Sequence, residues 1–190
     1  MTEYQIIKHC APTLAGLKSG NLIRISFNNK KDLFGQIGAI NRKINNKGIY
    51  LIALSVSSSE AWIYIFRPHL LQKLLDNNDA MQILGNLGYD LSSVSGLLKC
   101  LKTRLENYDM KDNFPHEIGF FLGYPPEDVI SFFKNKGKNY LLCGPWKVYH
   151  DVCSAQCIFE KHRKCTRIYC ERYTSGTTLE KLAVRSSISC

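Results

Sequence analysis

The feature that most constrains this chain is a rigid Gly-Tyr-Pro-Pro corner at residues 123–126, between two apolar segments. Pro125 disfavours the helical conformation at Tyr124, so a helix in the preceding HEIGFFLG segment must end near Gly123. Pro126 suits the first turn of a following helix, because its missing N–H would have no partner there. The corner therefore predicts two helices that are held at a fixed angle.

Several runs of apolar, β-branched and aromatic residues predict strands. IYLIALSV (49–56) and AWIYIFR (61–67) flank a short polar turn, which is typical of a β-hairpin. Asn21–Phe27 also has strand character, and apolar residues recur at helical spacing over 30–48, a helix that Gly48 is expected to end. A further strand with a Gly-Pro break is predicted in NYLLCGPWKVY (139–149).

The remaining segments indicate helices. One short helix is expected in CAPTLAGLK, with Pro12 in its first turn, and a long one in VCSAQCIFEKHRKCTRIYCERY near the C-terminus. The natural arrangement is an α+β fold, with α/β-type layers in which several helices cover a small mixed sheet of about four strands, including the hairpin. No repeat or linker divides the chain, so we expect a single domain over 1–190 with a polar tail from about 184.

The charge permits several classes of partner without selecting one. The chain of 190 residues has a formal net charge of +9, with 45% hydrophobic and 22% charged residues. This excess permits nucleic acid or another anionic ligand, but the basic residues are dispersed and do not favour nucleic acid. No apolar run approaches the roughly 20 residues that a membrane span needs, so we expect no membrane partner.

The eight cysteines would suggest disulfides in a secreted chain. The first residues, MTEYQIIKHCAPTLAG, lack the basic and then apolar regions of a signal peptide. We therefore expect a cytoplasmic protein whose cysteines are mostly reduced, several of them as small core residues.

An adjacent histidine and carboxylate, His116 and Glu117, stand just ahead of the proline corner. Neighbouring side chains on a helix diverge by about 100°, so both cannot face one ligand if both are helical. One interpretation is that His116 faces a site while Glu117 caps the helix or pairs elsewhere. The alternative is a capping carboxylate beside a half-buried imidazole.

Four segments carry a resemblance to a known family: HCAPTLAGLK, FPHEIGFFLGYPPEDVISF, GPWKVY and KCTRIYC. Together they resemble a bacterial family known as domain of unknown function 3793, which is common in anaerobic Firmicutes such as clostridia. The likeness extends from His9 to about Leu182. It implies a small, single-domain, cytoplasmic bacterial protein and leaves the chemistry open.

Residues that resemble the family pattern, from distant parts of the chain, are the candidates for a functional site. A pocket lined by His, Cys, Lys and Arg would form if they meet. Cys10, ahead of a helix beginning at Pro12, would have a lowered pKa and could act as a nucleophilic or redox thiol with His9 or His116 as base. The alternative for Cys10 is a buried structural thiol. The candidates for ligand binding are Thr13, Lys18, Arg67, Glu117, Tyr124, Lys147 and Tyr149.

Cysteines in the long C-terminal helix invite a metal interpretation. Cys153 and Cys157 are helical i,i+4 neighbours that could share one ion, and Cys165 follows two turns later. Ligands on one continuous helix cannot surround a tetrahedral centre, and the tight Cys-x-x-Cys pairs of zinc ribbons are absent. We therefore assign no metal site and keep these three cysteines as weak candidates.

The sequence supports three classes of function. The leading hypothesis is a protein that binds a small molecule, or a metal or redox cofactor, in the mixed pocket described above; the identity of the ligand or cofactor is unknown. The first alternative is an enzyme that uses Cys10, and the second is a basic nucleic-acid-binding protein. Glycine-rich nucleotide-binding loops of the GxGxxG or GxxxxGK[ST] type are absent from the sequence.

Overall fold

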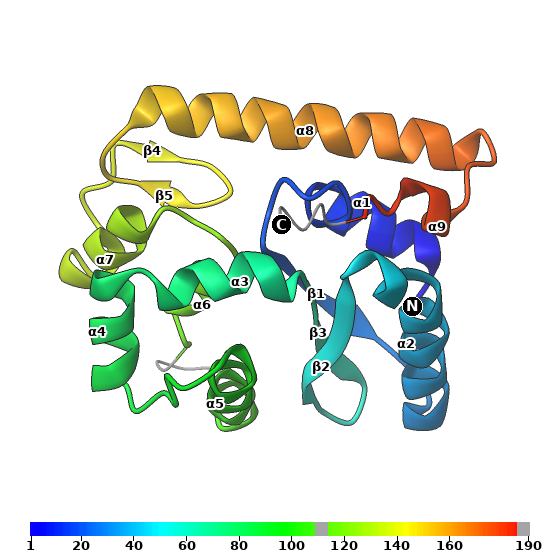
Figure 1. Cartoon of the computed structure of the whole chain (residues 1–190), viewed down its shortest axis with the longest axis horizontal. Coiled ribbons are helices and arrows are strands. Elements are labelled where there is room, and N and C mark those ends of the chain that lie inside the picture. The colour runs from blue at the N-terminus through cyan, green and yellow to red at the C-terminus, as the bar shows by residue number, and fades with distance from the viewer. Residues whose placement is uncertain (109–113, 186–190) are drawn as a thin grey trace. The chain divides into compact units, whose positions relative to one another are not determined.

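The computed structural model describes residues 1–108 and 114–185. The chain divides into two compact units, unit 1 (Met1–Leu70 and Lys164–Cys190) and unit 2 (Leu71–Arg163). Each combines helices with antiparallel strands (Figure 1), which confirms the predicted α+β class. A single domain over 1–190 stays a prediction, since two compact units can still unfold together.

The elements follow one another along the chain with short connections. Those of unit 1 are α1 (Glu3–Leu14), β1 (Gly20–Ser26), α2 (Lys30–Ile44), the 3₁₀ turn η1 (Asn45–Lys47), β2 (Tyr50–Val56), β3 (Glu60–Phe66) and α9 (Leu179–Leu182). Those of unit 2 are α4 (Asn78–Asn86), α5 (Val94–Glu106), α6 (Ile118–Phe121), α7 (Pro126–Lys134), β4 (Leu142–Cys143) and β5 (Lys147–Val148). α3 (Pro68–Leu75) and α8 (Val152–Thr174) contribute residues to both.

The sheet of unit 1 has the strand order β1-β3-β2 and is antiparallel throughout. The β2–β3 hairpin is confirmed, and β3 pairs with both other strands. Because β1 and β2 each run antiparallel to β3, they are parallel to one another but separated by it. The predicted mixed sheet of about four strands is therefore wrong in this detail: β1 and β2 share no hydrogen bonds, and β4 and β5 form a separate pair.

One face of this sheet packs on the core of unit 1. Alternate residues of β3, namely Ala61, Ile63 and Ile65, are buried in it. The apolar stripe predicted for α2 joins them, and the helix gives way to η1 and a left-handed Gly48, as its sequence indicates. Further core side chains come from α1 and α9: Ile6, Ile7, Cys10, Leu14, Leu179 and Leu182.

The other face of β3 carries aromatic residues at alternate positions, Trp62, Tyr64 and Phe66. Tyr64 and Phe66 stack with ring centroids 5.1 Å apart, and they are 0% and 6% exposed. They are therefore buried side chains. Trp62 is half-buried, and the guanidinium carbon of Arg24 lies 5.9 Å from its ring centroid.

The first helix begins earlier than predicted. α1 starts after Thr2, whose hydroxyl accepts from the Gln5 N–H at 3.2 Å while the Thr2 N–H donates to the Gln5 side chain at 2.8 Å. This capping box satisfies two backbone donors that a helix start leaves without partners. Pro12 lies in the last turn, so the prediction of a helix beginning there was wrong.

The proline corner in unit 2 is confirmed. α6 ends before Gly123, which adopts a left-handed conformation (φ 70°), and Pro126 opens α7. α6 is shorter than the predicted helix, because His116 and Glu117 precede it in a turn. Asp128, in the first turn of α7, is buried and accepts from Trp146 Nε1 and the Tyr149 N–H, each at 2.8 Å. The carboxylate thereby ties α7 to the segment that contains β5.

The β4–β5 pair packs on the first half of α8. Trp146 and Phe159 form an edge-to-face pair with centroids 4.5 Å apart. Gly144 allows this close approach, because a Cβ there would lie 2.3 Å from the Phe159 ring. The predicted break at Gly144-Pro145 is thus the turn between two very short strands.

At Val184, near the predicted start of the polar tail, the N–H donates to Leu14 O at 3.0 Å and the carbonyl accepts from Arg67; the tail itself stays a prediction. Residues 186–190 lie outside the described residues.

By sequence, unit 1 holds 14 Lys or Arg and 5 Asp or Glu, whereas unit 2 holds 11 of each. The entire excess of +9 therefore belongs to unit 1.

Candidate functional site

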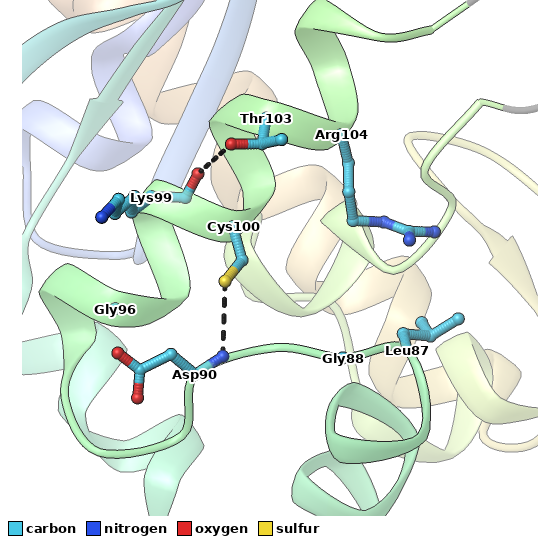
Figure 2. A pocket seen from close by; sticks show the side chains of 8 residues that line it. All are labelled: Leu87, Gly88, Asp90, Gly96, Lys99, Cys100, Thr103 and Arg104. Carbon is cyan, nitrogen blue, oxygen red and sulfur yellow. Dashed lines mark hydrogen bonds between the residues drawn. The ribbon is translucent and has the colours of Figure 1, made fainter.

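A groove in unit 2 is the strongest candidate for a site. It encloses about 310 Å³ between the turn that follows α4 and one face of α5 (Figure 2). Its lining combines small, apolar and charged residues: Leu87, Gly88, Asp90, Gly96, Lys99, Cys100, Thr103 and Arg104. The groove therefore has Cys, Lys and Arg in its lining but no His, and none of the residues predicted for the site lines it.

Arg104 is fixed at one side of the groove by a buried carboxylate. Its Nε donates to Glu117 Oε1, which also accepts from the Tyr89 hydroxyl at 2.9 Å. Glu117 is 1% exposed and the Arg104 side chain 37% exposed, so the guanidinium reaches solvent from a buried anchor. Burial raises the pKa of Tyr89 far above its usual range, which keeps the hydroxyl a donor. Neither terminal nitrogen of Arg104 has an acceptor among the described residues.

Cys100 occupies the middle of the groove. Its Sγ accepts from the backbone N–H of Asp90 at 3.3 Å, and Lys99 and Arg104 extend to either side of it (Figure 2). The Asp90 carboxylate is engaged by Ser92, through the N–H at 3.0 Å and the hydroxyl at 2.6 Å. These bonds lower the pKa of Asp90 and hold the turn before α5.

Gly96 allows that turn to approach α5. A Cβ at this position would lie 2.4 Å from the Asp90 carboxylate and 2.9 Å from its backbone oxygen. Any larger residue would push the turn away and alter the groove. The absence of a side chain at Gly96 is therefore a requirement of the groove and not of the helix.

The predicted residues Cys10, Thr13, Lys18 and Arg67 gather in unit 1 near the end of α1. Arg67 is 1% exposed; its Nε donates to Thr13 O at 2.6 Å, and one Nη donates to the carbonyls of Leu14 at 2.7 Å and Val184 at 2.8 Å. The guanidinium thus bonds to backbone carbonyls at the end of α1 and at Val184. The Thr13 hydroxyl donates to Asn21 at 2.8 Å.

Cys10 does not have the environment predicted for a reactive thiol. It is 0% exposed within the last turns of α1, and burial raises its pKa to about 12, against a smaller lowering by Lys18. Burial in turn lowers the pKa of Lys18 to about 8, although the Cys10 thiolate would raise it. The expected lowering at Cys10 was wrong, because the thiol lies inside a helix and not ahead of one. His9 is exposed on α1.

His116 and Lys147 belong to unit 2 and lie within electrostatic range of one another. Burial lowers the pKa of His116, Glu117 raises it and Lys147 lowers it. The His116 ring is exposed, with its centroid 4.7 Å from that of Phe132. Lys147 Nζ donates to Gly137 O at 2.7 Å and lies 4.8 Å from the Tyr140 ring centroid. Glu117 thus pairs with Arg104 and its side chain makes no capping bond to α6, whereas a site facing His116 stays a prediction.

Tyr124 and Tyr149 have packing positions in the same unit. Tyr124 stacks on Trp146 with centroids 5.1 Å apart, and burial raises its pKa. The hydroxyl oxygen of Tyr149 is buried and has no hydrogen-bond partner in the described residues. Neither residue lines the groove.

The weak metal candidates do not share one face of α8. Cys153 and Cys157 are exposed, whereas Cys165 is buried and burial raises its pKa to about 11. In residues 1–108 and 114–185, no three His, Cys, Asp or Glu side chains are placed to hold one ion. The seven cysteines of this part of the chain are all free of disulfides.

Sequence reasoning missed the groove, although one signal was present. Gly96, Lys99, Cys100, Thr103 and Arg104 recur at intervals of three and one, which places them on one face of a helix. This periodicity could have marked a polar face of α5. The turn that completes the groove comes from a different segment, and only the tertiary structure places it there.

The comparisons agree with the family resemblance. The family described as "Protein of unknown function (DUF3793)" matches residues 6–183. The chain therefore belongs to this family, which confirms the resemblance carried by its four segments. No curated protein and no solved structure matches the chain. None of the helices in the described ranges has the length and apolarity that a membrane span needs.

Proposed function

We propose that this protein binds a small anionic molecule, carrying a carboxylate or phosphate group, in the groove beside α5. The observation that carries the proposal is Arg104, whose guanidinium is held at the groove by the buried Glu117 carboxylate and keeps its terminal nitrogens for a ligand. A planar guanidinium in a fixed orientation is well suited to binding carboxylate or phosphate oxygens.

Lys99 supplies a second positive charge at the groove, which is needed because the ion pair with Glu117 partly neutralises Arg104. It is exposed, lines the groove and has no ion-pair partner within 4 Å in the described residues. Asp90 opposes an anion, although Ser92 engages one of its two carboxylate oxygens, Oδ1, through both of its bonds. Because unit 2 has no net charge by sequence, binding would depend on this local arrangement and not on general attraction.

Cys100 would lie against the bound molecule. Its thiol belongs to the lining, so a ligand in the groove should shield it from alkylation. The hypothesis of an enzyme that uses Cys10 as a reactive thiol has less support, because that thiol is buried and its pKa is raised. We therefore place the proposed activity in binding and not in thiol catalysis.

The test is a titration of the protein with inorganic phosphate, followed by amide NMR at constant ionic strength set with chloride. We expect shifts confined to residues 87–104, and a Lys99→Met variant whose dissociation constant rises at least fivefold. Lys102→Met is the matched control, since Lys102 lies on α5 outside the groove and pairs with Glu106 at 3.8 Å. Phosphate shifts elsewhere in the protein, or equal losses in both variants, would refute the proposal.

A second candidate function is favoured by the segregation of charge. All of the +9 excess lies in unit 1, and such asymmetry is typical of surfaces that bind nucleic acid. We expect a single-stranded oligonucleotide to bind with a salt-dependent affinity. The slope of log K against log salt concentration should be about −0.7 for each phosphate that the protein contacts. Replacing exposed Lys31 and Arg42 with Glu should weaken binding, whereas the same change at Lys134 and Lys138 of unit 2 should not.

A further inference from the structure

The exposed face of α8 carries two thiols one helical turn apart. Cys153 and Cys157 are both exposed and free of disulfides. Ala155 and Phe159, on the opposite face of the helix, are buried in a cluster with Trp146. The two thiols thus face solvent from a helix whose other side is anchored.

The spacing of this pair excludes one product and permits another. Residues i and i+4 of a helix have Cβ atoms about 5–6 Å apart, whereas a disulfide needs about 3.5–4.5 Å. Two metal–sulfur bonds of about 2.3 Å span about 4.6 Å between sulfurs, which two thiols on neighbouring turns can reach by side-chain rotation. The helix therefore opposes disulfide formation between Cys153 and Cys157 but permits a bridging metal ion.

The number and softness of the donors select the ion. Zinc in structural sites takes four ligands, and no set of three metal-binding side chains occurs in the described ranges. Copper(I) is a soft ion that prefers sulfur ligands and accepts two thiolates in a linear arrangement. A complex of Cu(I) with two thiolates has a net charge of −1, which the exposed Lys161, one turn beyond Cys157, would favour. Glu160 on the same face is already paired with Arg163.

We propose that Cys153 and Cys157 form a two-coordinate binding site for Cu(I). On binding, each thiol releases one proton to solvent and each sulfur donates an electron pair to copper. The metal keeps its oxidation state, so no oxidant or reductant is consumed. Affinity should therefore increase with pH while the thiols still carry their protons.

The test is an anaerobic titration of the full chain with Cu(I) supplied as its acetonitrile complex, in competition with the colorimetric chelator bicinchoninate. We expect one tightly bound equivalent per chain. Cys153→Ser and Cys157→Ser should each lower the affinity at least 100-fold, and bound copper should protect both thiols from iodoacetamide. Cys143→Ser, at another exposed thiol of unit 2, is the matched control and should leave the affinity unchanged.

Three results would overturn this assignment. The first is an affinity for Cu(I) in either serine variant that stays within threefold of that of the unsubstituted protein. The second is a stoichiometry of two chains per copper ion, and the third is displacement of the copper by an equimolar amount of Zn²⁺. Both substitutions lie on the exposed helix face, so circular dichroism should show an unchanged fold. The Lys99→Met variant should bind copper normally, which separates this site from the groove.

Discussion

Glu117 anchors two side chains, and its replacement by glutamine tests whether this buried carboxylate stabilises unit 2. In the protein, Glu117 Oε1 accepts from the Tyr89 hydroxyl at 2.9 Å and from Arg104 Nε. Glutamine keeps the volume and one oxygen acceptor but removes the negative charge. Glu117→Gln therefore isolates the contribution of charge from that of packing.

The expected loss follows from the difference between charged and neutral hydrogen bonds. Bonds to a charged group contribute about 1.5–3 kcal/mol and neutral bonds about 0.5–1.5 kcal/mol, so the Tyr89 bond, which becomes neutral, loses about 1 kcal/mol. The Arg104 bond keeps its charged donor and loses the attraction of the ion pair. The Arg104 term is discounted because that side chain is 37% exposed and solvent screens it. Relief of carboxylate desolvation acts in the opposite direction. We expect a net loss of about 1–2 kcal/mol in the free energy of unfolding.

The two tryptophans provide an assay for each unit. Trp62 belongs to unit 1 and Trp146 to unit 2, so a Trp62→Phe background leaves fluorescence from unit 2 alone. With an m-value of about 1–2 kcal/mol/M, Glu117→Gln should lower the urea midpoint by about 1 M. Tyr89→Phe should cost about 1–2 kcal/mol, and the double variant less than the sum of the two losses.

An unchanged or higher urea midpoint in Glu117→Gln would refute this reasoning, because desolvation would then cost more than the two bonds return. Additive losses in the double variant would show that Tyr89 and Glu117 are not coupled. The same reporters test the single-domain prediction: Trp62 and Trp146 should report coincident transitions if the two units unfold together.

Three further predictions concern other parts of the chain. Gly96→Ala should lower the free energy of unfolding by about 1–3 kcal/mol, because the new methyl group would meet a carboxylate oxygen at 2.4 Å; Gly35→Ala, with no atom within 4 Å of its Cβ, should raise it by up to about 1 kcal/mol. Cys10 should react with iodoacetamide at least 100-fold more slowly at pH 8 than the exposed thiols, as measured by mass spectrometry. Because its pKa is raised from 9.0 to about 12, its stabilising contribution should be complete below pH 9 and be lost as the pH rises towards 12. Lys147→Met should raise the pKa of His116, as followed by NMR titration of the imidazole, and an unchanged pKa would contradict the electrostatic contact.

Local patterns predicted most elements of this fold. The apolar spacing of α2 and its end near Gly48, the β2–β3 hairpin, and the proline corner before α7 all depend on interactions within a few residues. The start of α1 was missed because the prediction relied on Pro12, whereas the capping box at Thr2 begins the helix. Both signals are local, but only the capping box also agrees with the burial of Ile6 and Ile7.

Residues far apart in the chain determined the rest. The position of β3 between β1 and β2 depends on which strand edges meet, and no local pattern specifies this. The predicted site residues were distributed between the two units, with Arg67 bonded to backbone carbonyls in one and Glu117 to Arg104 in the other. The segregation of charge was also hidden, because the chain returns to unit 1 at Lys164.

The sequence by itself determined the class of fold, the family and most helices and strands, since these follow from side-chain periodicity and backbone preferences over short distances. Only the tertiary structure decided that Cys10 is buried, that Glu117 holds Arg104, and that α5 meets the turn at Asp90 to form a groove. The physical reason is that burial and electrostatic pairing depend on which distant segments come into contact, and these contacts set the reactivity of each group.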